Sequence, residues 1–198
     1  VMINANTTWT GASSTGSTPK SAADRVFIFD RTDVYFSGGY NRTWGYLWIN
    51  DGAKMEYKPT AVRSLTLTGL DVEGTFEATT ELDDLSVTNF NLKSGGTFTV
   101  DTVDALNLTN FDIENLATAT VSSATSLTTT DLDVDGSLTI TTTGDISATD
   151  LDMSGTLDIG GTNDLTLDNL NISSGGSLTV TSLENGSIKN LVLNGTID

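Results

Sequence analysis

Short runs of alternating apolar and polar residues fill most of the chain after residue 63. A single Ser or Thr separates Leu85 from Val87 and Phe98 from Val100. A period of two is typical of strands that bury one face, because successive side chains point to opposite sides. The runs are short and end at Asn, Asp or Gly, which favour turns, and the many Thr residues disfavour helix. The pattern therefore predicts many short strands joined by tight turns.

The same segment recurs along the chain at a nearly constant period. Its copies have the form L-x-L-x-[GND]-[LF]-x-[VIL], from Leu65–Val72 to Leu165–Ile172, and a weaker copy ends at Leu193. A second motif, [TS]-[FLAI]-x-[VIA], follows in each copy, often after a Gly where a turn needs a positive φ. Members of one apolar position lie 19 to 21 residues apart: Leu70, Phe90, Phe111, Leu132, Leu151, Leu170 and Leu191.

This repeat predicts a stacked all-β fold. Three short strands that close within about 20 residues form one coil of a parallel β-solenoid, with coils about 4.8 Å apart. Parallel crossovers favour the right-handed form. A leucine-rich repeat has a similar period but needs a helical or 3₁₀ side, which the pattern lacks. A β-sandwich could use such strands but gives no reason for identical columns.

The first part of the chain differs from the repeats. Both prolines, every Trp and every Tyr precede residue 64. One further coil matches the template at Leu47–Tyr57, and two strand-like runs, Val26–Phe29 and Asp33–Phe36, come before it. A solenoid needs a cap over the edge of its first coil. We therefore expect an N-terminal aromatic β cap and assembly region at residues 1–45, followed by solenoid coils at residues 46–198.

Composition limits what this protein can do. The chain has 198 residues, a formal charge of −17, no Cys and no His. This excludes a thiol nucleophile, a Ser-His-Asp triad and a Cys/His zinc site, and such a negative charge argues against nucleic acid as a partner. The charge is also uneven. Residues 1–63 carry 7 basic and 5 acidic residues, whereas residues 64–198 carry 2 and 21.

Two features bear on the compartment. The apolar runs are far too short to span a bilayer, so we expect no membrane span. The chain begins at Val1 rather than at an initiator Met, which is what removal of a signal peptide would leave. We therefore expect a secreted protein, extracellular or at the cell surface.

Two segments resemble a known group of proteins. Ile3–Gly11, which contains Thr7, Thr8 and Trp9, and Trp48–Tyr57 are similar to the start of β-helical bacterial surface proteins. These include large adhesins and autotransporter-type passengers, in which such a segment precedes the first coils. The resemblance implies a β-solenoid at the cell surface, either adhesive or fibre-forming. Its motifs are structural, so it implies no active site.

Stacking turns each outward position of the repeat into a column. Two neighbouring columns bring together Asp112, Asp131, Asp133, Asp150 and Asp152. Like charges one coil apart repel each other. Either a hard cation such as Ca²⁺ bridges them through oxygen ligands, or water and salt screen them while stacked Asn side chains bond along the column. Calcium is therefore a candidate ligand of these five residues, and no other cofactor is expected.

Other outward columns suggest further hypotheses. Thr-x-Thr pairs such as Thr97 and Thr99 form a regular array of the kind that suits ice binding, although Glu77 and Asp158 interrupt it. Exposed Thr is also simply a good strand residue. A polysaccharide-cleaving enzyme could use paired carboxylates, but usually combines them with a basic residue in a loop-walled groove, and these coils have almost no base.

The last copy of the repeat supports an assembly hypothesis. It stops at Asn194–Asp198 with no aromatic or proline-bearing cap after it, so either the chain is a fragment or another subunit covers the end. A head-to-tail contact that does not close generates a filament. We expect a structural, non-enzymatic subunit of an extracellular filament or a surface adhesin. Its expected partners are further copies of the same protein, stacked head to tail, and surface glycans. The expected interface residues are Val1, Ile3, Trp9, Leu191, Leu193 and Ile197. The alternative is a binding module for glycan, calcium or ice.

Overall fold

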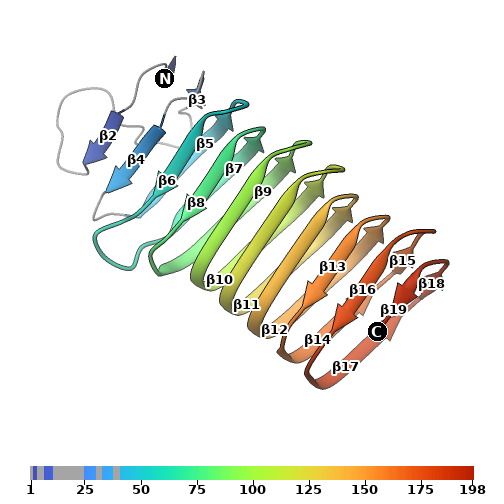
Figure 1. The fold of residues 1–198 in the computed structure, drawn as a ribbon. Helices are drawn as coiled ribbons and strands as arrows, with labels where there is room; N and C mark the ends of the chain where they lie inside the picture. The colour runs from blue at the N-terminus through green and yellow to red at the C-terminus, as the bar shows by residue number, and fades with distance from the viewer. Residues whose placement is uncertain (1, 4–6, 11–24, 30–32, 38–40) are drawn as a thin grey trace.

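The computed structural model describes residues 2–3, 7–10, 25–29, 33–37 and 41–198. Every regular element in these ranges is a strand, and the strands wind into a stack of coils (Figure 1). None of the described residues forms a helix long and apolar enough to cross a membrane. The strands are β1 Met2–Ile3, β2 Thr7–Thr10, β3 Arg25–Ile28, β4 Asp33–Ser37, β5 Arg42–Ile49, β6 Lys54–Tyr57, β7 Leu65–Val72, β8 Thr75–Ala78, β9 Leu82–Leu92, β10 Thr97–Ile113, β11 Thr118–Val134, β12 Ser137–Met153, β13 Thr156–Ile159, β14 Thr162–Asp168, β15 Leu170–Ile172, β16 Ser177–Val180, β17 Leu183–Lys189, β18 Val192–Leu193 and β19 Thr196–Ile197.

Each coil pairs with the next in parallel, and equivalent repeat positions lie directly beside one another. Phe111 pairs with Phe90 on one side and with Leu132 on the other. This confirms the predicted β-solenoid. A sandwich would place the repeats in antiparallel hairpins, and the described coils have no helical side of the kind that a leucine-rich repeat needs.

The strands are longer than expected in the middle of the stack. Instead of three short strands per coil, β10, β11 and β12 are each continuous over 17 residues. The alternation of buried and exposed residues breaks where two neighbours, such as Thr109 and Asn110, both face outward. The chain bends there, yet both flanking segments keep their partners in the next coil. The corners of the coil are thus bends within a paired strand rather than breaks between strands.

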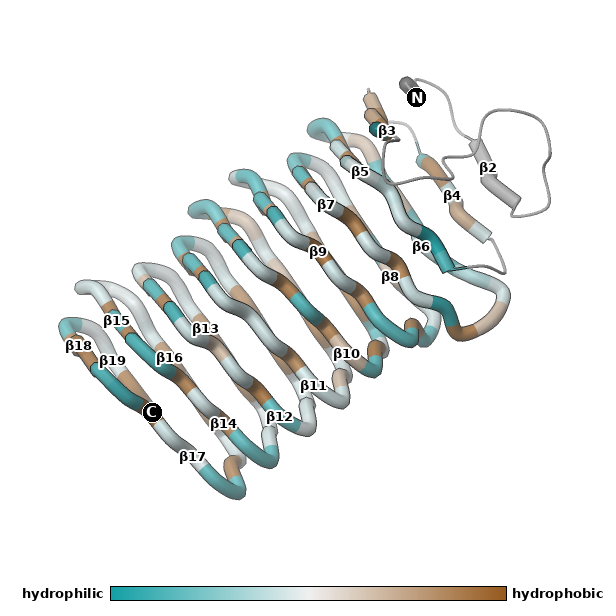
Figure 2. Tube along the Cα trace, turned by 180° about the vertical axis from the view of Figure 1, so that it is seen from behind, coloured by the Kyte–Doolittle hydropathy of each residue, from teal (hydrophilic) through white to brown (hydrophobic). Residues whose placement is uncertain are grey.

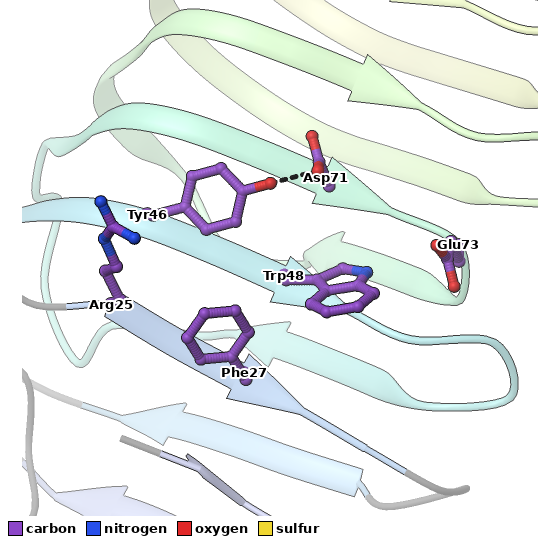
Figure 3. A pocket seen from close by; sticks show the side chains of 6 residues that line it. All are labelled: Arg25, Phe27, Tyr46, Trp48, Asp71 and Glu73. Carbon is purple, nitrogen blue, oxygen red and sulfur yellow. Dashed lines mark hydrogen bonds between the residues drawn. The ribbon is translucent and has the colours of Figure 1, made fainter.

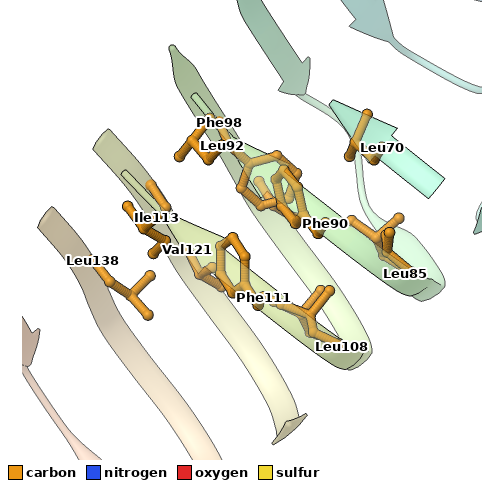
Figure 4. Close-up of a cluster of buried hydrophobic side chains, with 14 of the residues drawn as sticks. Leu70, Leu85, Phe90, Leu92, Phe98, Leu108, Phe111, Ile113, Val121 and Leu138 are labelled. Carbon is orange, nitrogen blue, oxygen red and sulfur yellow. The ribbon is translucent and has the colours of Figure 1, made fainter. Parts of the chain in front are cut away.

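The inward residues form one core that runs along the axis of the stack. Hydrophobic and hydrophilic stretches alternate along each coil (Figure 2). In the middle of the core the rings stack from coil to coil. The ring centroids of Phe90 and Phe111 lie 4.4 Å apart (Figure 4), and those of Phe76 and Phe98 lie 5.3 Å apart. The next residue in the column of Phe76 and Phe98 is Ala119. The coil that carries Phe111 therefore has a small residue where the preceding coil has a second ring.

Turn length accounts for the difference between the coils of 19 residues and those of 21 residues. The turns that follow Phe90, Phe111 and Leu170 are longer. In one of them, Lys93–Gly96, the backbone N–H of Gly96 donates a hydrogen bond to the carbonyl of Lys93. Coils after Leu132 and Leu151 use a turn two residues shorter, such as Asp135 and Gly136. The strands on either side of both turns remain in register, so the extra two residues change the turn alone.

One position in the longer turn is left-handed. Gly52, Gly95 and Gly175 occupy it with φ of 71°, 83° and 97°, and Leu116 occupies it with φ of 67°. The left-handed region costs an L residue roughly 1–2 kcal/mol, and Gly avoids this cost. The side chain of Leu116 is also 78% exposed, so its packing does not offset the cost of the left-handed backbone.

The parallel ladder also includes strands that lie before residue 46. Strand β3 pairs with β5, and β4 pairs with β6, in the same register that the later coils use. The backbones of β1 and β2 pair in turn with β3 and β4. Large aromatic rings fill the core of this region, where Phe36 stacks on Tyr57 at 4.9 Å and Trp44 packs edge-on against both. The aromatic N-terminal region thus forms rungs of the same ladder.

Replacing Leu116 by Gly should raise the urea midpoint of unfolding, by an amount equivalent to about 0.5 kcal/mol. Relief of the left-handed strain is partly offset by the greater chain entropy of Gly. Leu116→Ala is the matched control, because it removes the exposed leucine and keeps a Cβ at positive φ. Equal stabilisation by Ala and Gly would show that the exposed side chain, and not the backbone conformation, is the cost.

Candidate functional site

The five acidic residues proposed for calcium lie in two adjacent outward columns. Asp112, Asp133 and Asp152 pair directly from coil to coil, and Asp131 pairs with Asp150 in the neighbouring column. The columns lie side by side because Asp131 and Asp133 are two residues apart on β11. The register thus places these five residues in two neighbouring columns, and we call them the acidic columns.

Asparagine side chains donate hydrogen bonds to the acidic columns at one end. Nδ2 of Asn171 donates to Asp152 at 2.8 Å, and Nδ2 of Asn169 donates to Asp150 at 2.6 Å. In the coils before the acidic columns, Nδ2 of Asn91 donates to Asp71 at 2.6 Å, and Nδ2 of Asn110 donates to Asn89 at 2.8 Å. Among the described residues, no side chain donates a hydrogen bond to Asp112, Asp131 or Asp133. An amide donor thus follows each acidic run, while the carboxylates in the middle face one another.

The middle carboxylates are electrostatically strained. Partial burial raises the pKa of Asp133, and the surrounding Asp135, Asp112, Asp152 and Asp131 raise it further. Partial burial also raises the pKa of Asp112, against the opposing effect of Lys93 nearby. Nζ of Lys93 itself forms an ion pair with Glu114 at 2.7 Å. Repulsion within the columns is therefore only partly compensated by the one lysine beside them.

A shallow hollow of about 190 Å³ lies at this point, lined by Asn91, Asn110, Phe111, Asp112, Asp131 and Asp133. Within the described part of the chain, no three His, Cys, Asp or Glu side chains converge closely enough to hold a metal ion. Calcium binding by the acidic columns stays a prediction.

The Thr-x-Thr pairs form two straight columns on another face. Thr97 pairs with Thr75 and Thr118, and Thr99 pairs with Glu77 and Thr120. The second column is interrupted by Glu77 and Asp158, as the sequence indicated. Glu77 also forms an ion pair with Lys54 at 2.6 Å. This is a polar sheet face with charged positions at intervals.

The predicted assembly residues lie at opposite ends of the stack. Leu191 and Leu193 belong to the last coil and are 45% and 47% exposed, while Ile197 packs partly against the core. Strands β17 and β18 pair with the preceding coil on one side only. At the other end, the backbone of Ile3 pairs with Ile28 and that of Trp9 pairs with Phe36. Val1 and the side chains of Ile3 and Trp9 lie outside what the structure describes.

A feature that the sequence analysis missed lies on the outward side of β3, β5 and β7. A hollow of about 350 Å³ is lined by Arg25, Phe27, Tyr46, Trp48, Asp71 and Glu73 (Figure 3). We call these six residues the aromatic hollow. Register explains its position, because Phe27, Trp48 and Asp71 occupy one outward column, the same column that continues through Asn91 into the acidic columns.

The rings of the aromatic hollow contact one another directly. The centroid of Phe27 lies 5.8 Å from that of Trp48 and 6.2 Å from that of Tyr46. Phe29 continues the cluster, 5.8 Å from Trp48. The side chains are partly exposed rather than buried. Nε1 of Trp48 is closed off from solvent and has no hydrogen-bond partner in the described structure.

Tyr46 connects the rings to the carboxylates. Its ring lies over Gly69 in the next coil, where a Cβ would come within 2.5 Å of it. Its hydroxyl donates a hydrogen bond to Oδ2 of Asp71, whose Oδ1 accepts the bond from Asn91. Burial, the bond to Asp71 and the charge of that carboxylate raise the pKa of Tyr46 far above its usual range. Tyr46 therefore stays a neutral donor and holds Asp71 in place.

The sequence contained one signal for this site. Alternation puts Tyr46 and Trp48 on the outward side of a strand, at positions that are Asp, Asn or Gly in the later coils. Large aromatics at solvent-facing positions are unusual, but their grouping with Phe27 depends on a register between coils of unequal length.

Comparison with known proteins gives no relative. No protein-family model, no curated protein and no solved structure matches the chain.

Asp133→Asn should stabilise the protein at pH 7 and low salt, by a few tenths of a kcal/mol, the scale of an exposed like-charge pair. Because the pKa of Asp133 is raised in the folded state, the fold is more stable when this carboxyl is protonated. This stabilisation is fully present below the pKa of the unfolded state and is lost as the pH rises through the pKa of the folded state. The gain from the variant should therefore vanish at acid pH and shrink in salt.

Urea unfolding measured at several pH values and salt concentrations checks this prediction. Asp101→Asn is the control, because it removes one exposed charge outside the acidic columns. A gain of equal size in Asp101→Asn would show that net charge, and not the columns, is responsible. The same measurement with added Ca²⁺ and with chelator tests the calcium hypothesis, which an unchanged midpoint would contradict.

Proposed function

We propose that the protein is a structural, non-enzymatic β-solenoid of the cell exterior, forming a filament by head-to-tail stacking or a part of a surface adhesin. The observation that carries this proposal is the parallel ladder, in which equivalent positions of successive coils pair in register throughout the described part of the chain. The resemblance of the first coils to β-helical surface proteins supports the same assignment.

The edge of the last coil has the properties of a stacking surface. Leu183, Ile188, Leu191 and Leu193 are each at least 41% exposed there. Their counterparts one coil earlier, such as Leu167 and Ile172, are buried. A further coil, from the same polypeptide or from a second copy, would bury these side chains and pair the free backbone groups.

Parallel pairing also determines the direction of stacking. Every rung of the ladder presents the same pattern of donors and acceptors to the next, so a copy adds head to tail in the direction of the stack. Such a contact does not close on itself and produces a filament. The charge distribution favours it, because the more basic part, residues 1–63, would meet the acidic repeats of the next copy.

The composition supports a role without catalysis. The sequence holds no Cys or His, which removes the side chains most often used as nucleophile or general base at neutral pH. The acidic columns lie on an open face with Lys93 as their basic neighbour. A stack of coils with short turns is suited to bearing load and spacing other surfaces apart.

Negative-stain electron microscopy of the 198-residue protein tests the proposal. Unaltered protein at high concentration should form uniform fibres one coil wide. Leu193→Asp should abolish them, because it places a charge on the stacking surface, and deletion of residues 1–6 should do the same if that segment supplies the opposite surface. Persistent monomers of the unaltered protein at high concentration would refute head-to-tail stacking.

Leu116→Asp is the matched control for Leu193→Asp. It introduces the same charge in place of an exposed leucine, but on a turn at the side of the stack. Fibres of Leu116→Asp should resemble those of the unaltered protein. If both variants lose fibres equally, general charge repulsion rather than the end surface controls assembly.

A further inference from the structure

We propose that the aromatic hollow is a binding site for a short neutral saccharide. The site is separate from the acidic and threonine columns and from the stacking surface. It lies on the side of the first coils, so its occupancy does not depend on filament formation. The proposal rests on the exposed ring surface, the immobilised carboxylate at its edge, and the size of the hollow.

The ring surface is continuous and accessible. Phe27, Tyr46 and Trp48 are each partly exposed on outward positions of neighbouring strands, and Figure 3 shows their side chains grouped over β3 and β5. Exposed aromatic patches mark binding surfaces more often than chance, because leaving such area in water is unfavourable. The apolar C–H face of a sugar ring can cover these rings while its hydroxyls remain at the edge.

The polar edge supplies acceptors for those hydroxyls. Asp71 receives hydrogen bonds from Tyr46 and Asn91, one on each oxygen. Each carboxylate oxygen can accept a second bond, so Asp71 is held in position and can still bind a hydroxyl. Glu73 lines the same hollow. A fixed acceptor loses little entropy on binding, which favours affinity at a small site.

The size and the ring geometry restrict the ligand. At about 350 Å³ the hollow is at the small end of ligand sites, which fits a short saccharide rather than a large cofactor. A quaternary ammonium ion would also suit aromatics beside carboxylates. However, the ring centroid of Phe27 lies only 5.8 Å from that of Trp48 and 6.2 Å from that of Tyr46. At these distances the rings are in contact, so they leave no cage between them for a cation. The two carboxylates of the lining, Asp71 and Glu73, outnumber its one guanidinium, Arg25, which disfavours acidic sugars.

Calorimetric titration of the 198-residue protein with cellotriose, maltotriose and the trimer of N-acetylglucosamine tests the proposal. At least one should bind with a Kd of about 0.1–5 mM. Trp48→Ala should weaken that binding about tenfold or more. Trp48→Phe should keep it within about threefold, because a ring remains and the shielded indole N–H makes no ligand contact. Thermal melting checks that each variant folds.

Two further measurements locate the site. The indole N–H resonance of Trp48, assigned by its loss in Trp48→Phe, should shift when saccharide is added. Tyr35→Ala is the matched control, because Tyr35 is an exposed aromatic on β4, outside the hollow, and it should leave binding unchanged. Asp71→Asn should weaken binding severalfold, since a neutral amide is a poorer acceptor than a carboxylate.

Several results would overturn the proposal. One is the absence of binding by all three neutral saccharides at about 10 mM. Binding that Trp48→Ala does not weaken, or that Tyr35→Ala weakens equally, would place the ligand elsewhere. Binding of phosphocholine without any neutral saccharide would make the hollow a cation site. Saccharide binding is measured independently of fibre formation, so a failure of the filament proposal would leave the saccharide proposal standing.

Discussion

Parallel pairing between coils is the constraint on which the rest of this structure depends. Each residue faces its equivalent in the next coil, so one choice of inward residue is repeated along the whole axis. A shift of one residue would turn every inward side chain outward. The core is therefore a set of columns, and the stacked Phe90 and Phe111 are one segment of such a column.

The same constraint concentrates chemistry on the outside. Because outward positions also repeat, one substitution pattern becomes a line of carboxylates, a line of threonines or a patch of rings. The single column through Phe27, Trp48, Asp71 and Asn91 changes from aromatic to acidic as it passes from coil to coil. The repulsion along Asp112, Asp133 and Asp152 follows from the register that packs the core, and the amide of Asn171, which donates to Asp152 at one end of the run, offsets part of it.

Most of the fold and part of the candidate sites were predictable from local pattern. The repeats of Leu70, Phe90 and Phe111 predicted both the solenoid and the acidic columns, because a constant period converts sequence position into spatial position. The continuity of β10 through its corners was not predictable, since an Asn or Asp marks a bend without showing whether pairing continues. The turn at Leu116 was also hidden, because leucine rarely takes a left-handed conformation.

The amino-acid sequence alone determined the class of fold, the division of charge and the identity of the repeating columns. These depend on local alternation and on period, which a chain carries whatever its partners are. Only the tertiary structure decided that Phe27, Tyr46, Trp48 and Asp71 form one hollow. Those residues come from coils of unequal length, and the hydrogen bond from Tyr46 to Asp71 spans 25 residues. Such a contact depends on how loops of different size bring their strands into register, which no local pattern specifies.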